Sequence, residues 1–391
     1  MSVQVSYKKQ TLLGFIGLLI LFLSIEAIAN VWWMTQINCE FEENEIFEQM
    51  DDVQKRQLCV DLYEIKTSGT ELIPNQQRDS ISINSLGFRG DDFSAEKPLE
   101  VYRIFMLGGS TMFGHGATSD QTTIPGYVQK QFENNYKNFN VEVINSGVQG
   151  ADSFNELELI KTRLLSYAPD MVVVYDGWND LRAENSPEEI RDNWRSICDL
   201  GVENNFDVII ALQPIAGFGN KSLTEQELIY STTGTNYNNV PLINSQDDYN
   251  NYAKNLEELS SCSQNLDLRG VFDDQTSPLY WDQGHVSDAG NSIVADALYA
   301  NLLPLLPKDI QSSSSYDKKI TDESSIFERN LKYAISSYKT PLMIGTIFSL
   351  DHISLPSDTE QTSNIPKNLI FETQSKEYET ESISIIVEVS N

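Results

Sequence analysis

Short apolar runs alternate with longer stretches of helical character between residues 100 and 306, and this alternation is the main structural signal of the chain. The runs predict strands at residues 101–107, 141–145, 171–175, 207–212 and, weakly, 270–273. Three of the runs are almost continuously apolar, as is typical of strands buried on both faces of a parallel sheet. The stretches that follow them predict helices near residues 122–137, 152–167, 187–204, 247–266 and 287–303.

Five strands, each followed by a helix, indicate an α/β fold with a parallel five-stranded sheet between two layers of helices. We therefore assign residues 100–306 to one domain. In open sheets of this kind the ligand site lies in the crevice beyond the carboxyl ends of the strands. Chemistry is expected at that edge of the sheet.

The N-terminus carries an apolar stretch that is long enough to cross a membrane. Residues 11–34 contain about 23 mostly apolar residues counted to Met34, which suffices for a transmembrane helix. Lysines precede the stretch, at Lys8 and Lys9, and acidic residues follow it. This charge asymmetry predicts a single-pass signal anchor with residues 1–10 in the cytoplasm.

A cleaved signal peptide is the alternative, because Ala27-Ile28-Ala29 has the small-x-small form of a cleavage site. Both interpretations export everything after residue 35. The protein is then either held in the cell membrane with its catalytic domain outside, or secreted.

Two further segments flank the predicted domain. Residues 35–99 form an acidic, membrane-proximal segment that ends in the turn-like sequence NSLGFRG, residues 84–90, which we expect to dock on the domain. Residues 307–391 form a linker, serine-rich by composition, and a C-terminal extension to which the sequence assigns no role.

Charge and cysteine content narrow the function. The 391 residues contain 27 Lys and Arg against 57 Asp and Glu, a net charge of −30, which excludes a nucleic-acid binder that relies on a basic surface. An exported chain can form disulfides. Of the three possible pairings of four cysteines we favour Cys39–Cys59 with Cys198–Cys262, and free thiols are the alternative. No Cys/His cluster indicates a metal site, and no cofactor is expected.

Three consecutive strands end in glycine-containing loops. The first loop reads Gly108-Gly109-Ser110-Thr111, the second contains Gly147 and Gly150, and the third reads Gly177-Trp178-Asn179-Asp180. A serine in such a strand-to-helix turn has an exposed hydroxyl. Three loops of this kind at one sheet edge indicate a site.

The fourth segment, residues 281–290, supplies an acid and a base. His285 is one of three histidines in the chain and follows Asp282 by three residues. This spacing lets the carboxylate orient the imidazole, and a weak nucleophile such as serine needs an oriented base of this kind.

In this order, the four segments resemble the SGNH (GDSL-type) hydrolases over roughly residues 101–306. The resemblance implies a flavodoxin-like three-layer α/β/α sandwich and a Ser-His-Asp mechanism on esters. By motif, Ser110 matches the nucleophile, His285 the general base and Asp282 its orienting acid. The N–H groups of Ser110 and Gly150 and the side-chain amide of Asn179 match the oxyanion hole.

The first segment departs from the family pattern, because it reads GGST where many members have GDSL. The missing aspartate is not part of the triad, so the change indicates a subfamily. The segment NSLGFRG also resembles one found ahead of membrane-anchored members.

Several neighbouring side chains are candidates for secondary roles. We consider His115, Trp178 and Trp281 as substrate contacts, with packing as the alternative role. Asp176 and Asp180 flank the third loop, and we expect them to bond the backbone of the turn.

The sequence thus predicts an exported serine ester hydrolase that cleaves an O-acyl ester, with O-acetyl groups on an extracellular glycan as the candidate substrate. One alternative is an O-acyltransferase that passes the acyl group from the same serine to a polysaccharide. A second alternative is a catalytically silent surface protein that binds glycans.

Overall fold

The computed structural model describes residues 6–36, 43–136, 140–308 and 310. A five-stranded parallel sheet forms the centre of the domain, in the order β6-β5-β7-β8-β9. The strands are β5 (Val101–Gly108), β6 (Asn140–Asn145), β7 (Met171–Asp176), β8 (Asp207–Leu212) and β9 (Gln264–Asp267). In chain order this is 2-1-3-4-5, the flavodoxin-like arrangement, so the predicted fold class is confirmed.

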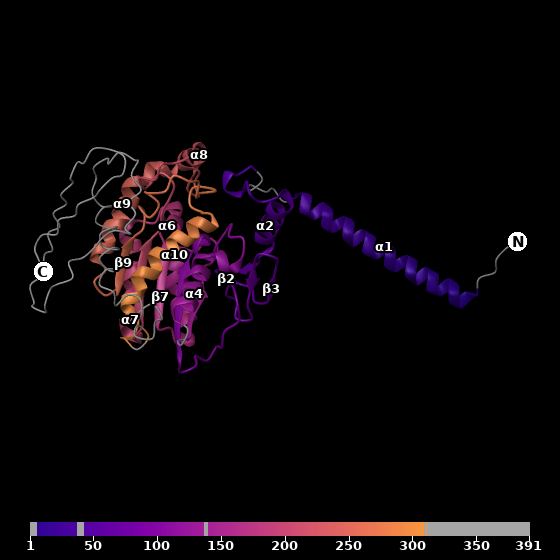
Figure 1. The fold of residues 1–391 in the computed structure, drawn as a ribbon, viewed down its shortest axis with the longest axis horizontal. Coiled ribbons are helices and arrows are strands. Elements are labelled where there is room, and N and C mark those ends of the chain that lie inside the picture. The colour runs from indigo at the N-terminus through magenta and orange to yellow at the C-terminus, as the bar shows by residue number, and fades with distance from the viewer. Residues whose placement is uncertain (1–5, 37–42, 137–139, 309, 311–391) are drawn as a thin grey trace, which may run out of the picture. The chain divides into compact units, whose positions relative to one another are not determined.

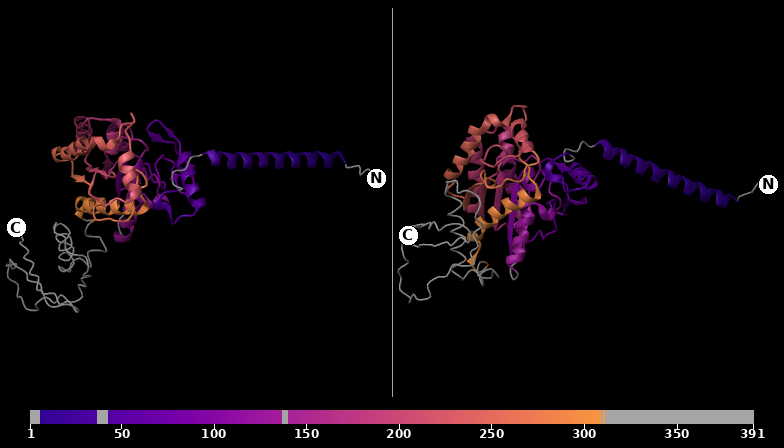
Figure 2. Two further views of the ribbon diagram at one scale, coloured as in Figure 1. Left: turned by 90° about the horizontal axis from the view of Figure 1, so that it is seen from above. Right: turned by 45° about the horizontal axis from the view of Figure 1, so that its top comes forward.

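Helices cover both faces of the sheet (Figure 1). One face packs against α4 (Ile124–Asn135) and α10 (Asp288–Leu302). The other face packs against α5 (Ser153–Thr162), α7 (Pro187–Asn204) and α9 (Gln246–Asn255). In the left view of Figure 2 the orange helix α10 lies along one side of the domain.

The central strand β5 shows why the sequence folds this way. All eight of its residues are buried. Ile104 and Met106 belong to the core under α4 and α10, whereas Phe105 and Leu107 belong to the core under α5 and α7. Successive side chains of a strand point to opposite faces, so a continuous apolar run is what a strand between two helical layers requires.

The last strand differs from the prediction. Residues 270–273 form a turn, and the strand lies at Gln264–Asp267, inside the segment predicted as helix 247–266. This strand is at the edge of the sheet and is half-buried or exposed, so polar residues suffice and no apolar run marks it. Phe272 is apolar because it anchors the turn in the core.

Shorter elements connect the layers. The remaining domain helices are α3 (Ser110–Phe113), α6 (Trp178–Ala183) and α8 (Glu225–Thr233). Single 3-10 turns are η2 (Asp120–Thr122), η3 (Leu164–Tyr167), η4 (Leu242–Ser245), η5 (Leu256–Glu258) and η6 (Leu303–Leu305).

The membrane-proximal segment is folded onto the domain from residue 43 onward. Its elements are η1 (Glu45–Phe47), α2 (Asp52–Glu64), β1 (Thr67–Ser68), β2 (Glu71–Leu72), β3 (Gln76–Gln77) and β4 (Ser82–Ile83). Its buried residues Phe47, Leu58 and Ile83 form a third core together with Phe113 and Trp281 of the domain. The segment therefore forms part of the folded unit.

Helix α1 (Tyr7–Gln36) contains an exposed 27-residue stretch, Tyr7–Trp33, in which an 18-residue window has a mean hydropathy of 2.5. Within the described residues it is the one helix that is long and apolar enough to cross a membrane, and a signal sequence has the same properties. The predicted linker and C-terminal extension lie, from residue 311 on, outside the described residues.

A disulfide joins Cys198 in α7 to Cys262 in the turn before β9, with the two Cα atoms 4.7 Å apart. The sequence predicted a helix at Cys262, within residues 247–266, but this end of the disulfide lies in a turn. Cys39, the expected partner of the buried Cys59, lies outside the described residues, so that pairing stays a prediction.

Candidate active site

Ser110 lies at the carboxyl edge of the sheet because β5 ends at Gly108 and the short helix α3 begins at Ser110. The serine is 8% exposed. Gly109 cannot be replaced without movement, since a Cβ at this position would collide with the side-chain amide of Asn179. The Gly-Gly-Ser turn thus brings the serine against the third loop.

Asp282, His285 and Ser110 form a hydrogen-bonded row. Asp282 Oδ1 accepts the backbone N–H groups of Gly284 and His285, at 2.8 and 2.7 Å. Asp282 Oδ2 lies 2.6 Å from His285 Nδ1, and His285 Nε2 lies 2.7 Å from Ser110 Oγ. The acid, the imidazole and the hydroxyl are therefore aligned over two short hydrogen bonds.

The environment of Asp282 keeps it ionised. Burial alone would raise the pKa of this carboxyl, but His285 and the two backbone N–H groups outweigh burial and lower the pKa below its usual value. An ionised Asp282 requires a proton on Nδ1 of the imidazole. Nε2 is then free to accept the hydroxyl proton of Ser110.

Three hydrogen-bond donors of the first three loops are not used within the described residues. Asn179 donates one amide hydrogen to the carbonyl of Ala151, at 2.7 Å, and its second amide hydrogen has no acceptor among the described residues. In that part of the chain the N–H groups of Ser110 and Gly150 donate no hydrogen bond either. These three residues are the ones that the motifs matched to an oxyanion hole.

Aromatic rings enclose the imidazole. His115 and Trp281 stack on His285 with ring centroids 4.5 and 4.8 Å away, and Trp178 meets it edge-on at 5.0 Å. Burial, the neighbouring His285 and Arg89 lower the pKa of His115 to about 3, against the opposing effect of Asp282. His115 therefore stays neutral at physiological pH. It places no positive charge beside His285 that would compete for the carboxylate of Asp282.

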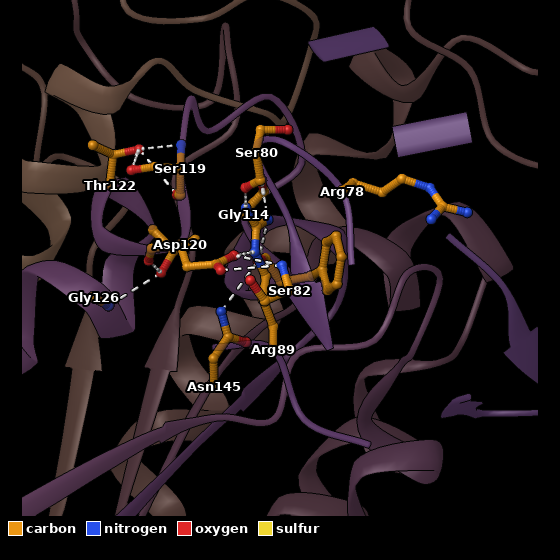
Figure 3. A network of polar contacts seen from close by, with 12 residues as sticks. Arg78, Ser80, Ser82, Arg89, Gly114, Ser119, Asp120, Thr122, Gly126 and Asn145 are labelled. Carbon is orange, nitrogen blue, oxygen red and sulfur yellow. Dashed lines mark hydrogen bonds and ion pairs between the residues drawn. The ribbon is translucent and has the colours of Figure 1, made fainter. Parts of the chain in front are cut away.

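The NSLGFRG sequence supplies a residue that sequence reasoning missed, Arg89. Its side chain is fully buried and lies among Ser80, Gly114 and Asp120, as Figure 3 shows. Nη1 donates to the carbonyls of Phe113 and Gly114, at 3.0 and 2.9 Å, and Nε pairs with Asp120 at 2.7 Å. The carbonyls at the end of a helix have no partner within the helix, so Arg89 satisfies those that follow Ser110.

The membrane-proximal segment also contacts the loop that carries Asp282 and His285. Asn44 donates to the carbonyl of Trp281, at 2.8 Å, next to Asp282. Asn145, at the end of β6, donates to the carbonyl of Phe113, at 3.1 Å. The membrane-proximal segment thus holds both the serine turn and the histidine loop, which confirms that NSLGFRG docks on the domain.

Behind the third loop lies a cluster of three buried acids, Glu156, Asp176 and Asp180. Asp180 accepts the N–H and hydroxyl of Ser153, at the start of α5. The backbone N–H of Gly177, in the turn, lies close enough to Asp176 to oppose the effect of burial on its pKa, although no described donor makes a well-aligned hydrogen bond to its oxygens. Burial and the adjacent acids raise the pKa values of Glu156 and Asp176 well above their usual range. No trio of His, Cys, Asp or Glu among the described residues is placed to hold a metal ion.

The chain is similar to one protein family and to several solved structures. Residues 106–293 match the model of the GDSL-like lipase/acylhydrolase family. No curated protein matches the chain. Solved structures similar to the domain include Axe2, an acetylxylan esterase from Geobacillus stearothermophilus, at 18% identity and a TM-score of 0.39, covering 51% of this chain and 93% of that one. The acetyl xylan esterase AlAXEase is similar at 20% identity and a TM-score of 0.37, covering 51% of this chain and 99% of that one. TesA is similar at 14% identity and a TM-score of 0.40, covering 52% of this chain and 99% of that one.

Replacing Arg89 should destabilise the protein. Arg89→Met leaves the Asp120 carboxylate without its cation, the Ser80 carbonyl without its donor, and the Phe113 and Gly114 carbonyls with one donor fewer, so we expect a loss of about 3 kcal/mol in the free energy of unfolding. Arg89→Lys keeps the charge but not the planar fork and should fall between Met and wild type. Denaturant unfolding of the purified chain measures both. Arg195→Met, at an exposed ion pair on α7, is the control and should change stability by less than about 0.5 kcal/mol.

Asp176→Asn should change how stability depends on pH. Because its pKa is raised in the folded state, the folded protein binds more protons than the unfolded chain above the normal carboxyl pKa, and stability falls as pH rises through that window. The variant should therefore gain stability relative to wild type between pH 5 and pH 8, measured as melting temperatures. Asp192→Asn, at an exposed position on α7, should show no such gain. Parallel pH curves for wild type and Asp176→Asn would contradict the proton-rich cluster.

Proposed function

Because this chain carries a domain of the GDSL-like lipase/acylhydrolase family and is a carboxylic ester hydrolase, we propose that Ser110 is its nucleophile. His285 is the general base and Asp282 orients it. The observation that carries this proposal is the row from Asp282 through His285 to Ser110, with spacings of 2.6 and 2.7 Å. The distances are within the hydrogen-bonding range that proton transfer requires.

The first half of the reaction acylates the serine. Ser110 Oγ attacks the acyl carbon while His285 Nε2 takes the hydroxyl proton, and the Nδ1 proton stays on the imidazole, facing Asp282. The imidazolium then gives the Nε2 proton to the departing alcohol. The second half repeats these steps with water as the nucleophile and returns the serine.

The negative charge that forms on the acyl oxygen is stabilised by three donors. They are the N–H groups of Ser110 and Gly150 and the free amide hydrogen of Asn179. A donor that is already oriented toward the oxyanion needs no reorganisation during the reaction, and each contributes about 10²–10³ in rate.

The proposed substrate is an O-acyl ester with a short acyl group, such as O-acetyl on an extracellular glycan. Ser110, Asn179 and His285 are each less than a tenth exposed, and Trp178 and Trp281 line the imidazole. A nearly buried hydroxyl beside two buried indole rings favours a small acyl group.

Export is supported by two independent features. Helix α1 has the length and hydropathy of a membrane anchor or a signal sequence. The disulfide between Cys198 and Cys262 is of the kind that persists in oxidising compartments outside the cytoplasm. We propose a cell-membrane location with the catalytic domain outside.

Ser110→Ala tests the nucleophile. The wild-type chain should react with a fluorophosphonate probe and turn over p-nitrophenyl acetate faster than the octanoate, and the variant should do neither. Free acetate released from an acetylated xylan measures hydrolysis, and an acetylated acceptor sugar would instead indicate transfer.

The control for this experiment is Ser166→Ala, which removes a hydroxyl bonded only to the Arg163 carbonyl and should behave as wild type. A folded wild-type sample that neither labels nor turns over would overturn the nucleophile and favour a silent glycan-binding protein.

Asn179→Ala tests the oxyanion hole. We expect kcat to fall by about 10²–10³ with little change in KM, because the amide bonds the charge that develops only in the transition state. Steady-state kinetics on p-nitrophenyl acetate separates the two constants. Asn301→Ala, whose amide bonds only the Ala297 carbonyl in α10, is the matched control. An unaltered kcat in Asn179→Ala would exclude the role.

A further inference from the structure

Arg182, in α6, is a cation without a carboxylate partner in the described part of the chain. No ion pair or hydrogen bond of its side chain occurs there, and its Nε is buried without an acceptor. Seven other described arginines do pair with acids: Arg78, Arg89, Arg103, Arg163, Arg191, Arg195 and Arg269. In so acidic a chain, an arginine that pairs with none of the described acids is unusual.

The two acids nearest to Arg182 along the chain are otherwise engaged. Asp180 accepts the N–H and hydroxyl of Ser153. Glu184 accepts the side-chain amides of Asn236 and Asn238, and these bonds fix the loop that follows α8.

Two aromatic rings orient the guanidinium of Arg182. Its Cζ lies over the ring of Trp178 at 5.1 Å and over the ring of Tyr237 at 4.7 Å. Both distances are within the range of a cation–π interaction. The Tyr237 N–H also donates to the Arg182 carbonyl, at 3.0 Å, which ties the loop to α6. Rings stacked on a guanidinium leave its in-plane N–H groups available, and their fork matches a carboxylate.

Trp178 connects this cation to the proposed active site. The indole is next in sequence to Asn179 and meets the His285 ring edge-on with centroids 5.0 Å apart. With Arg182 a further 5.1 Å from the indole, the guanidinium carbon lies no more than about 10 Å from the imidazole. A single sugar residue with an ester at one end and an acidic group at the other spans a separation of this order.

We propose that Arg182 forms a subsite for a carboxylate on the alcohol part of the substrate, so that the enzyme acts preferentially on O-acyl esters of uronic acid residues. This inference rests on the proposed esterase function. Tyr237 is 55% exposed and provides a ring on which the acidic sugar packs.

The charge of the chain supports the same conclusion. The surface is strongly acidic and repels an acidic glycan, although salt screens that repulsion beyond about 8–10 Å. A neutral glycan would need no cation near the ester. An arginine that no carboxylate of the described residues neutralises compensates for this repulsion close to the proposed active site.

The test compares two substrates that differ only in the carboxylate, the 3-O-acetyl esters of methyl glucuronoside and methyl glucoside. For the full wild-type chain, kcat/KM should favour the glucuronoside by roughly tenfold to a hundredfold, mainly through KM, as expected for a hydrogen bond to a charged group. Arg182→Gln should bring the ratio close to one, and Arg182→Lys should keep part of it. The ratio does not depend on the fraction of enzyme that is correctly folded.

Arg195→Gln makes the same charge change on exposed α7 and should keep the wild-type ratio. A wild-type ratio near one, or a ratio that Arg182→Gln leaves unchanged, would overturn the carboxylate subsite while ester hydrolysis stands.

A binding measurement keeps the two proposals apart. Methyl glucuronoside should bind Ser110→Ala in calorimetry, more tightly than methyl glucoside, and this preference should vanish when Arg182→Gln is added. Binding does not require turnover, so the subsite is tested even if Ser110 proves not to be the nucleophile. Equal binding of the two sugars would overturn the subsite.

Discussion

The hydrogen bond between Ser110 Oγ and His285 Nε2 joins two residues that are 175 positions apart, and the arrangement of the domain serves to close this distance. Parallel strands place the ends of β5, β6 and β7 at one edge. The short helix α3 then presents the serine, and the loop before α10 presents the imidazole. A shift of either loop by one ångström would break a bond of 2.7 Å, so both loops need rigid supports.

Those supports come from outside the sheet. Arg89 bonds the carbonyls that follow the serine turn, and Asn44 bonds the backbone beside Asp282. Both belong to the segment that precedes the domain in the chain. The third loop is backed differently, by the buried acids Glu156 and Asp176, whose pKa values are raised well above their usual range. The site thus rests on one paired buried charge and on two acids for which burial favours the neutral form.

The features that could be predicted from the sequence are those that depend on residues close together in the chain. Almost continuously apolar runs identified three strands, because strands buried on both faces have few polar positions, and the shorter run 141–145 identified a fourth. The polar edge strand Gln264–Asp267 left no such pattern. Asp282 and His285 were recognisable because they interact across three residues. Arg89 was not, since its partners Phe113, Gly114 and Asp120 lie 24–31 residues away and two of them are bonded through backbone carbonyls. Arg182 is unusual because it has no acidic partner among the described residues. A sequence does not reveal which arginines lack such a partner.

The location of Arg89 has a consequence for proteolytic release from a membrane. If α1 remains as the anchor, a protease that cuts ahead of Asn44 frees a particle that keeps both supports of the site. A cut between Asn44 and Arg89 separates the two, and hydrogen bonds to Tyr230, Trp281 and Gln226 together with buried packing then hold the piece that carries Asn44 on the domain. A fragment that begins at residue 106, where the family match begins, lacks both supports. Release that leaves both supports covalently joined to the domain therefore requires a cut between the apolar helix and Asn44.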